Sequence, residues 1–276
     1  MKKKVLQAKK KQGVNWVNSM LQANPLSLIL SAGLVVISLF ISYRQRLGLE
    51  GELVTSAFRV VLQLYLVGLL LSFIFDINHP LLTAALIGLI IINAAFHAAK
   101  RGAGIDHVFW ISLLAISFTV IGTLALLVLG GALAFTPSQV IALGGTIAGN
   151  SMTALGLAYG HLLTTFSQDH QKIQERLALG ANPKQASMGI IRQAMQKGMR
   201  PTLDKAYAVG IVTFPGTMNG LLFAGVEPKT AIMYQMMIMF THISTATIAS
   251  YVATHFAYQS FFDDRQRLKL SAQSRD

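Results

Sequence analysis

Seven apolar runs, each close to the length of a membrane-spanning helix, dominate this sequence. They lie at residues 26–43, 54–75, 80–98, 108–130, 138–159, 206–225 and 231–256. About 20 apolar residues in helical form cross the hydrocarbon core of a bilayer, which is about 30 Å thick. Only 12% of the residues are charged, which is too few to cover a water-soluble fold. We therefore predict an all-α, polytopic membrane helix bundle with about seven transmembrane helices.

The distribution of Lys and Arg predicts which loops are cytoplasmic, because basic loops next to membrane spans tend to stay inside. Basic residues follow the first, third, fifth and seventh runs: Arg44, Arg46, Lys100, Arg101, Lys172, Arg176, Lys184, Arg192, Lys197, Arg200, Arg265, Arg267, Lys269 and Arg275. The alternate loops contain only Lys229. The C-terminus and the long polar stretch at about 160–205 are therefore predicted on the cytoplasmic side of the plasma or inner membrane.

The N-terminal tail conflicts with this orientation. Seven spans place it outside, yet the first eleven residues carry six lysines, Lys2, Lys3, Lys4, Lys9, Lys10 and Lys11. Three arrangements would resolve the conflict. Either the tail is translocated, or the first run does not span the membrane, or the tail lies flat on the inner face. In the last case it would be an interfacial helix with Trp16, Val17, Met20 and Leu21 on one side. We favour seven spans with the N-terminus outside.

These boundaries divide the chain into a lysine-rich tail at 1–25, a permease domain at 26–258 and a cytoplasmic tail at 259–276. The net charge of +12 is explained by anionic membrane lipids, because the basic residues flank apolar runs, and nucleic-acid binding is excluded as the main function.

The polar stretch between the fifth and sixth runs reads as two helices. Asp169 to Leu179 has helical composition, Gly180 is a typical C-terminal stop, and Asn182-Pro183 is a typical helix start. In the second helix four apolar residues recur at helical spacing, Met188, Ile191, Met195 and Met199, and Pro201 is predicted to end it. This pattern predicts an amphipathic helical pair on the cytoplasmic membrane surface, which either only closes a loop or binds a partner.

The turn between these helices resembles the cytoplasmic EAA loop by which ATP-binding-cassette permeases dock on their ATPase subunits. The residues concerned are Glu175, Leu179, Gly180, Ala181, Asn182, Pro183, Lys184 and Gln185. The sequence departs from that motif, because the acidic residue is one position late and the closing Leu-Pro is missing. The chain contains no Gly-Lys pair and hence no P-loop, so ATP and Mg²⁺ are expected on a separate subunit, and no cofactor is expected on this chain.

The whole chain, from the first run to the seventh, resembles the FetB family of bacterial permeases, which includes plant aluminium-sensitivity proteins. Matching segments are Arg59-x-x-x-Gln63-Leu64, Val67-Gly68, Asn93-Ala94-Ala95, Lys100-Arg101, Ile147-Ala148-Gly149-Asn150-x-Met152, Gln174-Glu175 to Ala186, Pro201-Thr202-x-Asp204, Pro215-Gly216-x-Met218 and Gly220-Leu221-x-Phe223-Ala224-Gly225. The resemblance implies a homodimeric permease that is not itself an enzyme. It also implies a FetA-like ATPase partner, with iron or a related metal as exported cargo and relief of oxidative stress as the result. A non-metal cargo is the alternative that the plant members imply.

Polar and sulfur-containing residues within the runs are candidates for a translocation path, since such residues in a membrane face a protein interior or water. The candidates are Arg59, Gln63, Asn150, Met152, Met218, Asn219, Met236 and His242. Interhelical packing, or snorkelling of Arg59, is the alternative for each. Phe214-Pro215-Gly216 is predicted to kink or break the sixth span, and no metal ligands are assigned.

Two other function classes are open. Ser151 and His242 loosely resemble the serine-histidine dyad of intramembrane rhomboid proteases, but the residue after the serine is Met152 instead of glycine. An ATP-independent secondary transporter or channel is the second alternative, although the two halves of the chain show no repeat.

Overall fold

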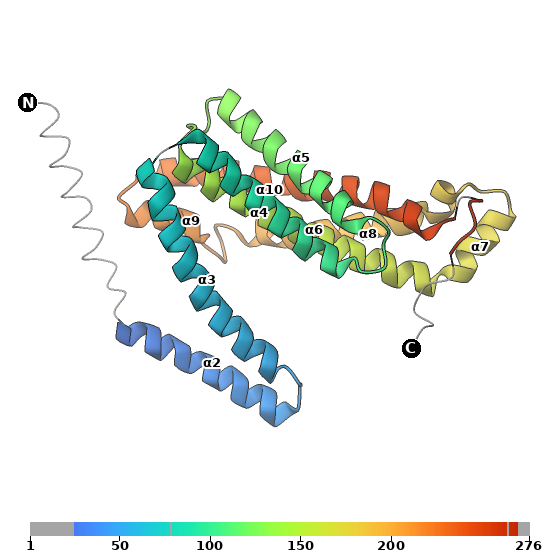
Figure 1. Ribbon diagram of the computed structural model, residues 1–276, viewed down its shortest axis with the longest axis horizontal. Coiled ribbons are helices and arrows are strands. Elements are labelled where there is room, and N and C mark those ends of the chain that lie inside the picture. Colours follow the sequence, from blue (N-terminus) through green and yellow to red (C-terminus); the bar gives the residue numbers. More distant parts are fainter. Residues whose placement is uncertain (1–24, 78, 264, 270–276) are drawn as a thin grey trace, which may run out of the picture. The chain divides into compact units, whose positions relative to one another are not determined.

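The computed structural model describes residues 25–77, 79–263 and 265–269 as helices joined by short turns (Figure 1). The elements are α2 Pro25–Gln45, α3 Glu50–Ile77, α4 Pro80–Arg101, α5 Val108–Leu129, α6 Pro137–Gln168, α7 His170–Ala178, α8 Pro183–Ala208, α9 Gly216–Phe223, α10 Pro228–Ala257 and the 3-10 turn η1 Tyr258–Phe261. Among these described residues, β-pairing is limited to two isolated bridges, Val209–Thr213 and Phe262–Leu268. The all-α prediction is confirmed. The predicted interfacial helix of the N-terminal tail and the last residues of the C-terminal tail lie outside the described residues.

Five of the described helices are long and apolar enough to cross a membrane. These are the stretches Glu50–Ser72, Pro80–Arg101, Val108–Leu129, Pro137–Gln168 and Pro228–Phe261. They match the predicted second, third, fourth, fifth and seventh spans. A helix satisfies its own backbone hydrogen bonds, which is why apolar segments adopt this form in lipid. The first predicted span corresponds to α2, whose searched part, Ile29–Gln45, is a shorter apolar helix.

The sixth predicted span, 206–225, is not one continuous helix. Helix α8 ends at Ala208, a turn bridges Val209 to Thr213, and the short helix α9 begins only at Gly216. Gly210 has φ +86°, and Pro215 lacks the N–H that a continuing helix would need. The predicted break at Phe214-Pro215-Gly216 is confirmed, and the prediction of a full-length span is wrong.

The described chain forms two compact units, which divide helices that are adjacent in sequence. One contains α2, α3, α9 and the first turn of α10, and the other contains α4 to α8, the rest of α10 and η1. In the first unit, α2 and α3 form a hairpin whose turn is held by a hydrogen bond from Ser42 Oγ to Glu50 Oε1 (2.9 Å). No residue of α3 between Glu50 and Ser72 is buried.

The second unit is built around α6, against which α4, α5 and α8 all pack. Small residues allow this close approach, among them Ala95, Ala98, Ala148 and Ala194, each fully buried. Two buried hydrogen bonds fix the register of α5 on α6. Thr119 Oγ1 and Ser151 Oγ are 3.3 Å apart, and Ser112 Oγ and Tyr159 OH are 3.1 Å apart.

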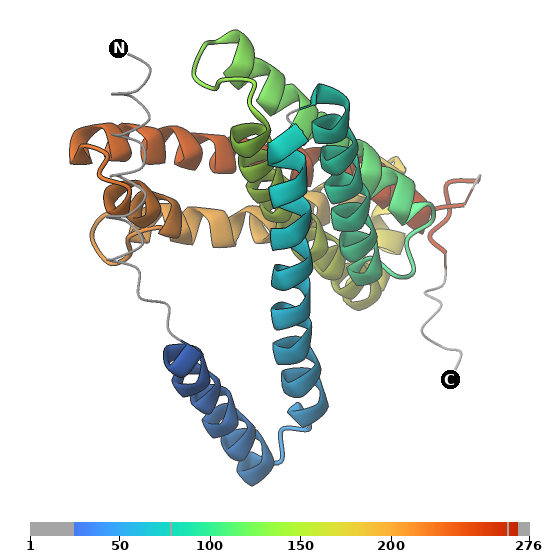
Figure 2. The same ribbon diagram turned by 60° about the vertical axis from the view of Figure 1, so that its left-hand side comes forward.

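The polar stretch at 160–205 does not form the predicted surface helix pair. Residues 160–168 continue α6, and α8 packs along α6 for much of its length instead of lying alone on a membrane surface (Figures 1 and 2). Its buried face consists mostly of small residues, Ala186, Ser187, Ile190, Ile191, Ala194, Gly198 and Thr202. Of the four predicted apolar residues only Ile191 is buried, because the close contact with α6 requires small side chains more than hydrophobic ones.

Pro201 lies inside α8, whereas the sequence predicted that it would end the helix. The helix continues to Ala208 because Pro201 removes one backbone donor only, and the packed residues on either side, Gly198 and Thr202, hold this segment against the bundle.

Candidate functional site

The turn between α7 and α8 is a rigid, exposed hairpin. Gly180 adopts φ +90°, a conformation that strongly favours glycine. Asn182 caps α8, since its side chain accepts a hydrogen bond from the backbone N–H of Gln185 (2.8 Å), while the Gln185 side chain accepts one from the N–H of Asn182 (3.1 Å). Arg176 Nη1 donates to the carbonyl oxygen of Ala186 (2.9 Å) across the hairpin. Helices α7 and α8 are thereby held as one body.

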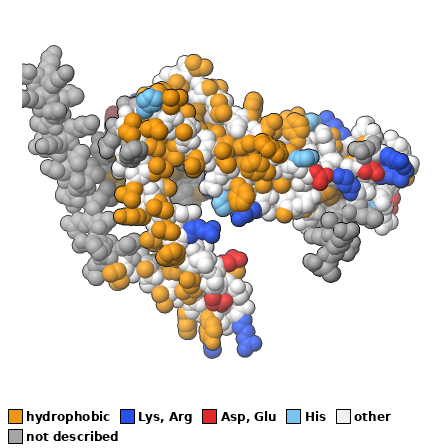
Figure 3. Space-filling view, viewed as in Figure 1, with side chains coloured by type: hydrophobic (Ala, Val, Ile, Leu, Met, Phe, Trp, Pro, Cys, Tyr) orange, Lys and Arg blue, Asp and Glu red, His pale blue; other side chains and the backbone are white. Residues whose placement is uncertain are grey.

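The tip of this hairpin presents a protruding apolar residue within a polar rim. Leu179 is 88% exposed. Glu175, Gly180, Asn182, Lys184 and Gln185 are also exposed, whereas Ala181 and Pro183 are half-buried. All eight residues of the predicted docking motif therefore lie together at one end of the unit, where charged side chains gather on the surface (Figure 3).

The C-terminal segment packs beside this tip. Phe166 stacks on Phe261 with ring centroids 4.0 Å apart, and Lys269 forms an ion pair with Asp106 (2.7 Å) in the turn between α4 and α5. A shallow groove of about 330 Å³ separates the start of α8, at Asn182 and Lys184, from Tyr258 and Phe262. The sequence analysis did not associate this segment with the hairpin, because no local pattern connects them.

Asn150 forms a hydrogen-bonded node inside the bundle. Its Nδ2 donates to the carbonyl oxygen of His242 (2.9 Å) and to Thr245 Oγ1 (3.3 Å), both on α10. Its Oδ1 accepts a hydrogen bond from Thr202 Oγ1 (2.9 Å) on α8. One amide thus joins α6, α8 and α10. Asn150 and His242 were predicted as candidates from the sequence, but Thr202 was not. Thr202 lies in the Pro201-Thr202-x-Asp204 segment, which is one of the segments that resemble the FetB family.

The serine-histidine pair of the protease alternative is not assembled. The Ser151 hydroxyl lies against Thr119 Oγ1, while His242 Nε2 is buried without a hydrogen-bond partner. A serine nucleophile requires a base within hydrogen-bond reach, and this geometry provides none for Ser151.

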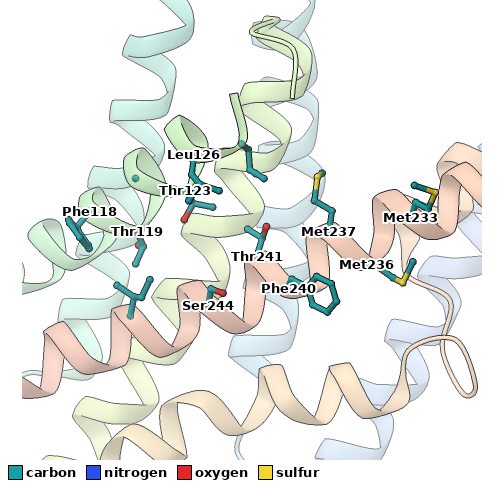
Figure 4. Close-up of a pocket in the computed structure, with 13 residues that line it drawn as sticks. Phe118, Thr119, Thr123, Leu126, Met233, Met236, Met237, Phe240, Thr241 and Ser244 are labelled. Atoms are coloured by element: carbon teal, nitrogen blue, oxygen red, sulfur yellow. The ribbon is translucent and has the colours of Figure 1, made fainter. Parts of the chain in front are cut away.

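Three methionines of α10 line a groove of about 770 Å³ between α5 and α10 (Figure 4). Met233, Met236 and Met237 line it from α10, and Phe118, Thr119 and Thr123 line it from α5. The groove lies in an apolar part of the unit, and its polar groups are hydroxyls. Within the part of the chain that the structure describes, no three His, Cys, Asp or Glu side chains are grouped to hold a metal ion.

The remaining candidates lie elsewhere. Met152 is half-buried on α6 beside the node. Arg59 and Gln63 are exposed one turn apart on α3, Met218 is buried on α9, and Asn219 follows it. These last four belong to the first unit, whereas Asn150, Met152, Met236 and His242 belong to the second.

Comparison with known proteins places this chain among membrane proteins. A family model described as "Uncharacterised protein family (UPF0014)" matches residues 25–262. The "Probable iron export permease protein FetB" of Escherichia coli (strain K12) is 42% identical over 245 residues, which cover 89% of this chain and 95% of that protein.

More distant relatives come from other bacteria and from plants. The "UPF0014 membrane protein YjkA" of Bacillus subtilis (strain 168) is 32% identical over 88% of this chain and 98% of its own length. The "Protein ALUMINUM SENSITIVE 3" of Arabidopsis thaliana is 31% identical over 88% of this chain and 89% of its own length. No solved structure matches this chain.

Proposed function

This chain is a multi-pass membrane protein of the UPF0014 family, and we propose that it is the permease subunit of an ATP-binding-cassette exporter. In this proposal a separate FetA-like ATPase binds ATP and Mg²⁺ and docks on the α7–α8 hairpin. Two copies of the permease work with two ATPase subunits in the plasma or inner membrane, with the C-terminus cytoplasmic. The cargo is iron or a related metal, and its removal protects the cell from oxidative stress.

One observation carries the docking role. Helix α8 begins at the exposed hairpin tip and continues through Pro201 to Thr202, whose hydroxyl donates to Asn150 of the node, so one helix connects the tip with the node. Its 26 residues span about 39 Å at 1.5 Å per residue. A partner that moves the tip therefore moves Thr202 and, through Asn150, acts on α6 and α10.

The cargo is proposed from the relatives. The Escherichia coli protein named "Probable iron export permease protein FetB" is similar along nearly its whole length. Two alternatives are kept as outcomes of the test, namely an exporter of a non-metal cargo and a transporter or channel that works without ATP.

The test begins with co-purification of this chain and a co-expressed FetA-like ATPase. Leu179→Asp is expected to abolish co-purification, because it places a charge at the most exposed apolar residue of the tip. Phe135→Asp is the matched control, since Phe135 is also apolar and exposed (61%) but lies in the turn between α5 and α6. Undiminished binding of Leu179→Asp would contradict the docking role.

Transport is then measured in inside-out vesicles that contain both proteins. ATP-dependent iron accumulation that is lost in Leu179→Asp is the expected result. Iron movement that needs neither ATP nor the ATPase would support a secondary transporter or channel. ATPase binding without any iron movement would support the docking role and favour a non-metal cargo.

A further inference from the structure

The depth of the Asn150 node in the membrane follows from the hydrogen bonds of the second unit. Helix α5, Val108–Leu129, is entirely apolar or hydroxylic and is just long enough to cross the hydrocarbon core. Thr119 lies at its middle and hydrogen-bonds Ser151, the neighbour of Asn150. The side-chain oxygen of Asn150 in turn accepts a hydrogen bond from the hydroxyl of Thr202 on α8. Thr202 therefore lies close to the bilayer midplane.

Charged residues flank Thr202 on the opposite side of α8. Arg200 and Asp204 are each two residues away, which places them within about 3 Å of Thr202 along the helix axis and about 160° around it. They form an ion pair of 3.0 Å with side chains 71% and 54% exposed. Lys197 lies on the same side and is exposed, and we define the charged face as Lys197, Arg200 and Asp204. Lys205 is also exposed, but it lies outside this face, about 60° around the axis from Thr202 and about 140° from Arg200.

This charged face cannot be accommodated by lipid. Charged side chains at the bilayer centre are strongly disfavoured and face protein or water. Snorkelling does not help Arg200 and Asp204, because each lies within about 3 Å of this depth and its side chain is much shorter than the remaining distance of about 12 Å to the surface. Lys197 lies about 7.5 Å from Thr202 toward the hairpin, so its side chain comes close to the membrane surface.

A protein cover would leave the excess positive charge unpaired. Within the part of the chain that the structure describes, every acidic residue other than Asp204 lies in the first or last turn of a helix, in a turn between helices or in the C-terminal segment. This holds for both units and for any second copy of the chain. Among the described residues, no carboxylate besides Asp204 is thus available at this depth to pair with Lys197 and Lys205, so water must solvate them.

We propose that the charged face of α8 lines a water-filled path through the membrane and that the species crossing it carries net negative charge. In this segment of α8, Lys197, Arg200 and the neighbouring Lys205 stand against one carboxylate, Asp204, so a positive potential concentrates anions in the path and repels a bare metal cation. This inference deepens the proposed function. If the cargo is iron, the iron crosses as a complex with excess anionic ligand groups, not as the hydrated ion.

Thiol labelling tests the path, because the chain contains no cysteine and each substitution supplies its only thiol. Gln196→Cys and Tyr207→Cys are neutral reporters exposed beside the charged face. Leu114→Cys is the control, since Leu114 is 54% exposed on apolar α5 and lies at a similar depth to Gln196. The probes are the anionic 2-sulfonatoethyl and the cationic 2-trimethylammonioethyl methanethiosulfonates, applied to membranes that contain the full chain and its ATPase.

Both α8 reporters are expected to react and Leu114→Cys is not. Relative to a free thiol, the anionic reagent should be favoured roughly tenfold at Tyr207→Cys. Adding Lys197→Gln and Lys205→Gln, which leave the Arg200–Asp204 ion pair intact, should remove most of that preference. Unreactive α8 reporters would show that lipid or protein covers the charged face. A preference for the cationic reagent would contradict the proposal that the crossing species carries net negative charge.

Transport separates this inference from the function on which it rests. In inside-out vesicles with the ATPase, iron supplied as a citrate complex should accumulate faster than hydrated ferrous iron. Faster accumulation of hydrated ferrous iron would overturn the anionic cargo while leaving iron export intact. If neither form accumulates, iron export fails, and the labelling result alone decides whether the path exists and which charge it favours.

Discussion

The side-chain amide of Asn150 both donates and accepts hydrogen bonds between helices, whereas most hydroxyl groups in this bundle form hydrogen bonds only within their own helix. Thr146, for example, donates to the carbonyl oxygen of Leu143 within α6 (2.9 Å). The sequence marked Asn150 as polar at membrane depth but left packing and path as equal alternatives. Deciding between them requires the positions of Thr202 and His242, which are far away in sequence and follow no local pattern.

Asn150→Ala is expected to lower the free energy of unfolding by about 1–2 kcal/mol, because it leaves Thr202 Oγ1 without its acceptor and removes the bonds to α10. Thermal unfolding of the purified chain in detergent measures the change. Thr146→Ala, which removes only an intrahelical bond, should cost less than about 0.5 kcal/mol. Equal losses in the two variants would argue that the node does not hold the helices together.

At the scale of the helices, the ends of elements were more predictable than their faces. Gly180, Asn182 and Pro183 are local stop and start signals, and α7 and α8 end and begin where these residues predict. The buried face of α8 was mispredicted because a search for apolar periodicity selects Met195 and Met199, whereas close packing in the bundle uses Ala194 and Gly198. Small residues carry little hydropathy signal, so their role appears only when the partner helix is known.

Gly198 and Gly189 provide a matched pair on α8 that tests this contact. A Cβ at Gly198 would lie 2.7 Å from the backbone oxygen of Ala154 and 2.6 Å from Ser250 Oγ, so Gly198→Ala must push α8 away from α6. We expect a loss of about 1–3 kcal/mol in the free energy of unfolding, together with loss of transport. Gly189→Ala meets no atom within 4 Å and should stabilise the helix by about 0.5–1 kcal/mol. Chemical denaturation of both variants measures the difference, and a neutral Gly198→Ala would refute the close packing.

For the whole molecule, five of the seven spans predicted by hydropathy are helices long and apolar enough to cross a membrane among the described residues, while one is a shorter apolar helix and one is broken. Hydropathy counted 206–225 as a span because Ile211, Val212 and Phe214 are apolar, but a Gly-containing turn and Pro215 interrupt the helix there. Average hydropathy over such a window does not register a break. The division into two units was not predicted either, since it separates α9 from its neighbour α8 in sequence.

The net charge of the molecule leads to a last prediction, about its lipids. The chain carries a formal charge of +12, and several of its basic residues, such as Arg44, Lys100 and Arg101, follow the predicted inner ends of spans. Basic residues near an anionic leaflet contribute about 1 kcal/mol each, and this attraction falls off within a Debye length. Reconstitution into phosphatidylglycerol bilayers should therefore raise the Tm by several degrees over phosphatidylcholine bilayers, and 1 M salt should remove most of the gain. Lys100→Gln, at the end of α4, should reduce the gain more than Lys229→Gln, because Lys229 lies in a predicted outer loop. Equal Tm values in the two lipids at low salt would mean that the basic residues serve the partner or the path instead of the membrane surface.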